Sequence, residues 1–138
     1  MRTLIPAILT AAALSSCAAP SPQQMAQAQA QSQMKLNKLL AGKVPGAPQS
    51  CLPTYRQNDM VVIDDYTIAF RDGVNRVWIN HPPGGCNMLG AGSYTLITHS
   101  SGIGLCRGDI GQVTDLMNHS TVGSCVMGDF VPYEKLRR

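Results

Sequence analysis

The chain has 138 residues with nearly balanced charge, 11 basic against 8 acidic residues, and a formal net charge of +3. Only 14% of the residues are charged, and the basic ones are scattered apart from Arg137 and Arg138. Proteins that bind nucleic acid usually carry a basic stripe interleaved with aromatic residues, and this sequence has none. Composition therefore gives no support to nucleic-acid binding, and the length suits one small domain with an extension.

The N-terminal segment has the order of a secretory signal. Arg2 provides a positive start, and residues 4–14 form an apolar stretch too short to span a bilayer. The run Leu14-Ser15-Ser16-Cys17 that follows resembles the lipobox of bacterial lipoproteins. In that class the signal is removed just before the cysteine, whose thiol is acylated. The resemblance implies that residues 1–16 are a signal peptide and that Cys17 is the lipid-attachment site.

The residue after Cys17 bears on the destination of the protein. In the lipoprotein class an aspartate at this place often signals retention in the inner membrane, and this chain has Ala18. Several acyl chains on one cysteine, palmitate among them, hold a protein on a membrane almost permanently. We therefore expect an outer-membrane lipoprotein that faces the periplasm, with the inner membrane as the less favoured alternative.

The mature sequence changes in composition along its length. Residues 18–33 consist almost entirely of Ala, Gln, Ser, Pro and Met without charge, which predicts a disordered tether. Leucines within residues 34–40 fall on one side of a helix, so a short helix is expected there, with a stop at Gly42. A Pro- and Gly-rich linker follows. The expected organisation is a signal peptide over residues 1–16, a lipidated tether with a short helix over 17–48, and a β domain over 49–138.

Strand signals dominate the rest of the sequence. Three runs rich in β-branched and aromatic residues, Met60–Ile63, Tyr66–Arg71 and Val74–Asn80, are separated by Asp64-Asp65 and Asp72-Gly73. Asp-Gly is typical of a two-residue hairpin turn, and the short first junction fits a second such turn. A three-stranded antiparallel meander is therefore expected.

Two-residue turns at both junctions would pair Ile68 with Val61 on one side and with Val77 on the other. Both turns then place the same residues on one buried face of the meander. That face would consist of Val61, Ile63, Tyr66, Ile68, Phe70, Val77 and Ile79. The opposite face would carry Arg71, Arg76 and Trp78, and an exposed tryptophan among cations predicts a contact surface for an envelope protein or a glycan. Alternatively, the tail, the short helix or a later strand covers this face.

Further strand signals follow the Pro- and Gly-rich loop after residue 81. Tyr94–Thr98 and Ile103–Cys106 have the pattern of a hairpin, and shorter strands are expected near Ile110–Val113 and Phe130–Tyr133. Gly and Pro separate these short strands. The fold class predicted is all-β, a small antiparallel β-barrel or sandwich of about six or seven short strands.

Beyond Cys17, the sequence has an even number of cysteines, which in an oxidising compartment predicts a disulfide framework. These are Cys51, Cys86, Cys106 and Cys125. The alternative is a zinc site, but spacings of 35, 20 and 19 residues contain no Cys-x-x-Cys knuckle. Of the three possible pairings we expect Cys86–Cys106, which would join the Gly-rich loop to the next hairpin, and Cys51–Cys125, which would join the first strand to the last.

The sequence shows no established catalytic motif. Gly-x-Ser-x-Gly and His-Glu-x-x-His are absent, and the three histidines, His81, His99 and His119, lie in polar, loop-like segments. His99 precedes Ser100, but adjacency in sequence is no evidence of catalytic geometry. The tripeptide Arg107-Gly108-Asp109 is interpreted as a structural turn. We expect a non-enzymatic protein with no metal ion or cofactor.

The cysteines and one short motif carry a resemblance. The matching features are Cys51 before the hairpins, Cys86 after the Pro-Gly loop, the run Leu105–Asp109, and Cys125 before Gly128-Asp129-Phe130. This order resembles a family of small proteobacterial lipoproteins that is defined only as a domain of unknown function. The resemblance covers roughly residues 49–133. It implies an envelope location and a compact β domain, and it carries over no catalytic residues.

These observations favour a cell-envelope lipoprotein that binds a protein, glycan or lipid component. A sharper alternative is a lipoprotein inhibitor of a cell-wall hydrolase such as lysozyme. Such inhibitors are small disulfide-bonded β proteins with a Ser/Gly-rich loop near a tyrosine, which Gly90–Tyr94 resembles, although their basic partner motif is missing here. An envelope enzyme with a concealed site is the third possibility.

Overall fold

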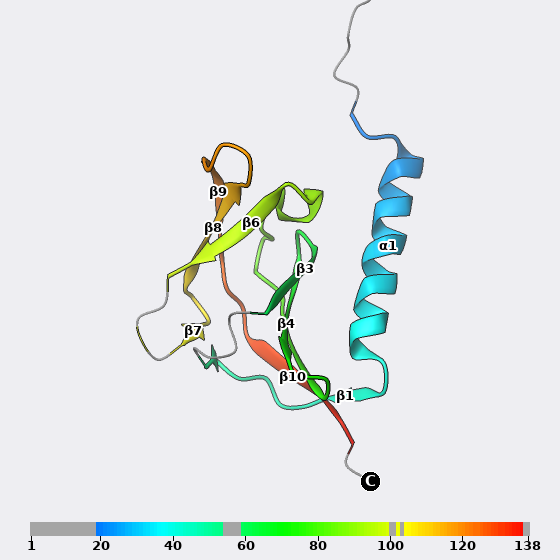
Figure 1. Cartoon of the computed structure of the whole chain (residues 1–138), viewed down its shortest axis with the longest axis vertical. Coiled ribbons are helices and arrows are strands. Elements are labelled where there is room, and N and C mark those ends of the chain that lie inside the picture. The colour runs from blue at the N-terminus through cyan, green and yellow to red at the C-terminus, as the bar shows by residue number, and fades with distance from the viewer. Residues whose placement is uncertain (1–18, 54–58, 100–101, 103, 137–138) are drawn as a thin grey trace, which may run out of the picture.

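Figure 1 shows the computed structural model, in which a helix lies along one side of a set of antiparallel sheets. The structure describes residues 19–53, 59–99, 102 and 104–136. Its elements are α1 Pro22–Leu40, β1 Lys43–Pro45, β2 Cys51–Leu52, β3 Met60–Asp64, β4 Thr67–Asp72, β5 Arg76–Asn80, the short helix η2 Leu89–Ala91, β6 Tyr94–Thr98, β7 Leu105–Cys106, β8 Ile110–Asp115, β9 Thr121–Val126 and β10 Phe130–Lys135. The predicted all-β class is confirmed.

Three sheets make up the β structure of the described residues. The largest has the order β1-β10-β5-β4-β3, a second has the order β6-β8-β9, and β2 pairs with β7 alone. These sheets do not join into a closed barrel. They enclose a common core between them, so the arrangement is that of a small sandwich. The predicted hairpin of residues 94–98 with 103–106 is wrong, since β6 pairs with β8 and β7 pairs with β2.

The β4–β5 hairpin has a register different from the predicted one. Ile68 lies opposite Asn80 rather than Val77. The reason is that three residues, 73–75, connect the strands instead of two. The shift amounts to an odd number of residues, and an odd shift turns each side chain to the other face of the sheet. Trp78 therefore points into the sandwich.

The β3–β4 hairpin is also shifted. Asp64 pairs with Thr67, and a bulge between Val62 and Asp64 adds one residue to β3. As a result Val62, and not Val61, lies opposite Ile68. A bulge of this kind reverses the inward and outward alternation beyond it. The single buried face predicted for the meander is therefore wrong.

The five-stranded sheet is instead buried on both faces. Its inner face packs against the other two sheets, where the rings of Phe70 and Phe130 have centroids 5.9 Å apart. The inner core consists of Leu52, Ile68, Phe70, Trp78, Cys86, Leu89, Leu96, Leu105, Val113, Cys125, Met127 and Phe130. The outer face carries Ile63, Ala69, Val77 and Ile79, against which Leu36, Leu39 and Leu40 of α1 pack. The helix thus covers the second face of the sheet.

Helix α1 is longer than the sequence analysis predicted. It begins at Pro22 rather than at residue 34, so most of the segment predicted as a tether is helical. Ser21 and Gln24 form a capping box, in which each side chain accepts a hydrogen bond from the main-chain amide of the other, at 3.3 and 2.8 Å. Proline at the first helical position adds to this start signal. Gly42, with φ of +70°, follows the helix and confirms the expected stop.

The described part of the chain contains no helix with the length and apolar character needed to cross a bilayer.

The region predicted as a linker belongs to the main sheet. Strand β1 pairs with β10, the Gly46 amide donates to the Pro132 carbonyl at 2.7 Å, and Gln49 forms a bridge with Phe130.

All four predicted disulfide cysteines are bonded, but the predicted pairing is wrong. The bonds join Cys51 to Cys106 and Cys86 to Cys125. Cys51 and Cys106 lie directly opposite each other in the β2–β7 pair, with Cα atoms 3.9 Å apart. Gly104 allows this pairing, because a Cβ atom there would lie 2.2 Å from the Leu52 carbonyl oxygen.

Trp78 offers a test of the observed register. Its side chain is 4% exposed, so Trp78→Ala should lower the free energy of unfolding by about 3–5 kcal/mol through lost burial and a cavity. Val74, which is 77% exposed in the β4–β5 connection, provides the control, and Val74→Ala should change stability by less than about 0.5 kcal/mol. Urea unfolding measures both, and equal small effects would contradict the register.

Candidate functional site

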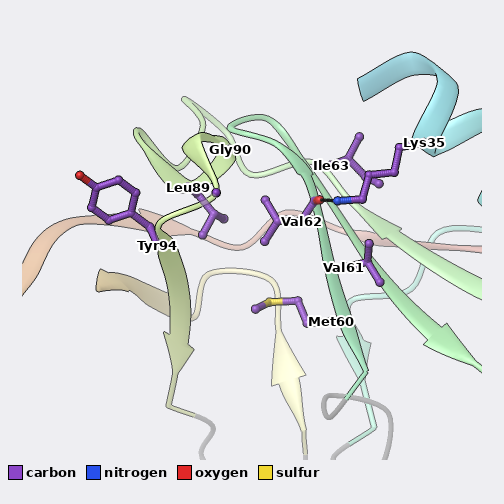
Figure 2. Close-up of a pocket in the computed structure, with 9 residues that line it drawn as sticks. Lys35, Met60, Val61, Val62, Ile63, Leu89, Gly90 and Tyr94 are labelled. Atoms are coloured by element: carbon purple, nitrogen blue, oxygen red, sulfur yellow. Dashed lines mark hydrogen bonds between the residues drawn. The ribbon is translucent and has the colours of Figure 1, made fainter. Parts of the chain in front are cut away.

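The candidate site lies where α1 passes the edge strand β3 and the β4–β5 hairpin, and Figure 2 shows the part of it beside β3. The Nζ of Lys35 donates to the main-chain carbonyl of Val62, and Ser32 Oγ donates to the Ile63 carbonyl at 3.1 Å. Strand β3 ends the five-stranded sheet, so these helix side chains occupy positions beside an otherwise open strand edge. They fix where the helix lies against the sheet.

Lys35 separates two hollows. On one side, a hollow of about 340 Å³ lies between β3 and the segment from η2 to β6, as Figure 2 shows. Its lining comprises Lys35, Met60, Val61, Val62, Ile63, Leu89, Gly90, Gly92 and Tyr94. On the other side, a hollow of about 450 Å³ lies between α1 and the β4–β5 hairpin, and we call it the basic groove. Its lining comprises Lys35, Lys38, Leu39, Lys43, Val61, Arg71, Gly73, Val74 and Val77.

The basic groove combines four cationic side chains with an apolar floor. Lys43 Nζ donates to the Leu39 carbonyl at 2.7 Å, as Lys35 does to Val62. An ammonium group has three donor hydrogens, so each of these lysines is held by one hydrogen bond and keeps two donors for a ligand. Lys38 adds a further exposed charge. The groove therefore has fixed positive charge beside apolar surface.

One carboxylate lies next to these cations. Asp59 Oδ1 accepts from Arg71 Nε at 3.1 Å and from Arg71 Nη2 at 2.7 Å. Both side chains are about half exposed, at 49% and 50%, so solvent screens this pair and its contribution to stability is small. Four cations beside one carboxylate leave the groove with a positive potential that favours an anionic ligand.

Asp65 positions the loop on the far side of the other hollow. Its carboxylate accepts from the Gly90 amide at 2.7 Å and the Met88 amide at 3.3 Å, and its carbonyl accepts from the Cys86 amide at 2.6 Å. Gly90 lies so close that a Cβ atom there would be 3.1 Å from the Asp65 amide nitrogen. The β3–β4 turn thus holds the loop before β6.

The structure does not bring the three residues of the predicted contact surface together. Trp78 is buried, so the prediction that it is exposed is wrong. Arg76 lies on the same face, with its guanidinium 5.9 Å from the Trp78 ring centroid and its Nε 2.6 Å from Glu134 Oε1. Arg71 lies on the opposite face and belongs to the basic groove. Only Arg71 of the three is retained in the candidate site.

Several other sequence candidates have structural roles or fall outside the described residues. Residues 1–16 and Cys17 are among the latter, as is Ser100, the neighbour of His99. His81 Nδ1 lies 3.1 Å from the Tyr66 carbonyl oxygen. Asp109 Oδ2 accepts from the Cys106 amide at 2.7 Å, which agrees with the turn expected for the Arg-Gly-Asp tripeptide. Within the described residues, His, Cys, Asp and Glu side chains form no group of three suited to a metal ion.

Sequence reasoning did not identify Lys35, Lys38 or Lys43. The available signal was the spacing of Lys35 and Lys38, three residues apart beside the apolar stripe of the helix. That spacing places both ammonium groups at one border of the buried face. Comparisons with family models, with curated proteins and with solved structures found no match for this chain.

Asp65 should be required for the geometry of the loop before β6. Asp65→Ala leaves two main-chain amides without their acceptor, which should lower the free energy of unfolding by about 1–3 kcal/mol. Hydrogen exchange at Gly90 should become faster in the same variant. Asp59→Ala removes an exposed carboxylate and should leave Gly90 exchange unchanged, whereas equal exchange in both variants would contradict this role.

Proposed function

We propose that this protein is a lipid-anchored component of the bacterial cell envelope that binds an anionic cell-wall polymer in the basic groove and catalyses no reaction. The basic groove carries the proposal, because four cations around an apolar floor suit a ligand with carboxylates or phosphates next to apolar groups. The lipobox-like run ending at Cys17 supports the envelope location. The two disulfides fit a protein that folds in an oxidising compartment.

Ala18 supports an outer-membrane position facing the periplasm, and the cysteine order supports membership of the uncharacterised lipoprotein family. The carboxylates support a binding role. Asp64, Asp65, Asp109 and Asp115 each accept hydrogen bonds from main-chain amides of their own turns or of a neighbouring loop. These carboxylates therefore have a structural role, which is to stabilise turns and the loop before β6.

Inhibition of a cell-wall hydrolase such as lysozyme is a second candidate function. The exposed loop Gly90–Ser93 favours it, because Asp65 holds this loop in place before Tyr94 and a preorganised loop inserts into a cleft at low entropic cost. A lysozyme inhibition assay distinguishes the two functions, since Asp65→Ala would weaken inhibition while charge reversal in the basic groove would not.

The lipid anchor has a direct test. Growth with a palmitate analogue should label the protein, and Cys17→Ala should abolish the label because it removes the acylated thiol. Ser16→Ala keeps a small residue before the cysteine and should retain the label. Finding the wild-type protein soluble and unmodified in the periplasm would contradict the anchor.

Charge reversal tests the basic groove. Lys38→Glu should reduce cosedimentation with purified cell-wall sacculi several-fold at low salt, and the difference should shrink as salt rises and screens the charges. Arg107→Glu makes the same charge change at an exposed side chain after β7, outside the groove, and should have little effect. Equal losses in the two variants would indicate non-specific attraction and would count against the groove.

A further inference from the structure

The tip of the β8–β9 hairpin exposes two large apolar side chains. Met117 is 86% exposed, the highest value among the large hydrophobic residues of the described chain, and Leu116 is 51% exposed. Apolar side chains held outward at a hairpin tip are uncommon in a small protein unless another phase or molecule covers them. The exposed apolar side chains of this tip are therefore of the kind that a loop needs to insert into an apolar phase.

Every main-chain amide from residue 115 to 120 has an acceptor within the protein. Asp115 Oδ1 accepts from the amides of Met117 at 2.7 Å and Asn118 at 3.3 Å. The Asp115 amide donates to the Ser120 carbonyl, and the Leu116 amide donates to the Ser93 carbonyl. The His119 amide donates to the Asp115 carbonyl, and the Ser120 amide donates to Asn118 Oδ1. An apolar phase demands such internal satisfaction of polar groups. The tip can thus leave water without exposing unpaired amides.

The position of the β8–β9 tip in the molecule indicates that a membrane lies against it. Figure 1 shows the β8–β9 turn at the same end of the long axis as the start of α1, with β1 and the last residues of β10 at the opposite end. Only three residues lie between Cys17 and Ser21, the N-cap of α1, so the two are four peptide steps and at most about 14 Å apart. An acylated Cys17 therefore keeps this end of the molecule close to the bilayer.

We propose that Leu116 and Met117 form a second membrane contact that inserts into the interfacial region of the bilayer beside the lipid anchor. The inference rests on the proposed acylation of Cys17. Two membrane contacts at the same end fix how the domain is oriented on the bilayer. From that end, α1 rises about 24 Å between Pro22 and Lys38, at 1.5 Å per residue. The basic groove is then held away from the membrane, where it can reach a polymer in the periplasm.

Tryptophan placed at the tip tests this contact. The lipidated full-length Met117→Trp protein is reconstituted in vesicles of phosphatidylethanolamine and phosphatidylglycerol whose acyl chains carry bromine, which quenches indole fluorescence on contact. The control is Val74→Trp, because Val74 is 77% exposed and lies near Lys43 of β1, the strand at the end opposite to the tip. Trp78 is buried in both proteins and supplies the same background.

We expect the emission at position 117 to shift to shorter wavelength and to be quenched several-fold more strongly than the emission at position 74. Equal quenching at both positions, or none at 117, overturns the inference. Mass spectrometry of the same samples reports the lipid on Cys17, and its absence defeats the proposed function as well. Leu116→Trp repeats the measurement with the same expected and contradictory outcomes, and it replaces the first variant if Met117→Trp does not fold.

Discussion

The three-residue connection between β4 and β5 determines how the whole domain is packed. With Asp72 opposite Arg76, the residues of β5 alternate so that Trp78 enters the sandwich while Val77 and Ile79 face outward. Outward-facing valine and isoleucine need a cover, since apolar surface is stabilised only when it leaves water. Helix α1 supplies that cover, and the sheet becomes the middle layer of the molecule.

The helix contributes to function because it docks incompletely. None of its residues is fully buried, and it is held by partly buried leucines and by hydrogen bonds from Ser32 and Lys35 to the edge of β3. A helix packed in this way leaves a seam along the sheet. Lysines at the border of its apolar stripe line the seam, and Arg71 faces them from β4. The basic groove is thus a consequence of the same docking that completes the fold.

Local features of the sequence predicted local structure well. Strand β6 has the predicted bounds, the leucine stripe lies in a helix, and the four domain cysteines are all disulfide-bonded. The sequence also contains a signal for the start of the helix, because Ser21 and Gln24 have capping-box spacing. The uncharged composition of the segment nevertheless favours a tether in the sequence analysis.

The structural features that the sequence did not predict depend on contacts between distant segments. Asp72-Gly73 is compatible with a two-residue or a three-residue connection, and only packing on both faces selects the longer one. The disulfide pairing required knowing that β2 pairs with β7, which are far apart in sequence. The basic groove likewise exists only once α1 has docked, so no motif indicates it.

Methyl NOEs between the helix and the sheet test the central claim that α1 covers the Val77 and Ile79 face while Trp78 lies on the other. The sample is the folded domain including α1, with labelled leucine, valine and isoleucine methyl groups. We predict NOEs from the α1 leucines to Val77 and Ile79, and none from these leucines to the Trp78 indole. NOEs between the helix leucines and the Trp78 ring would contradict the register, the two-faced sheet and the groove built on them.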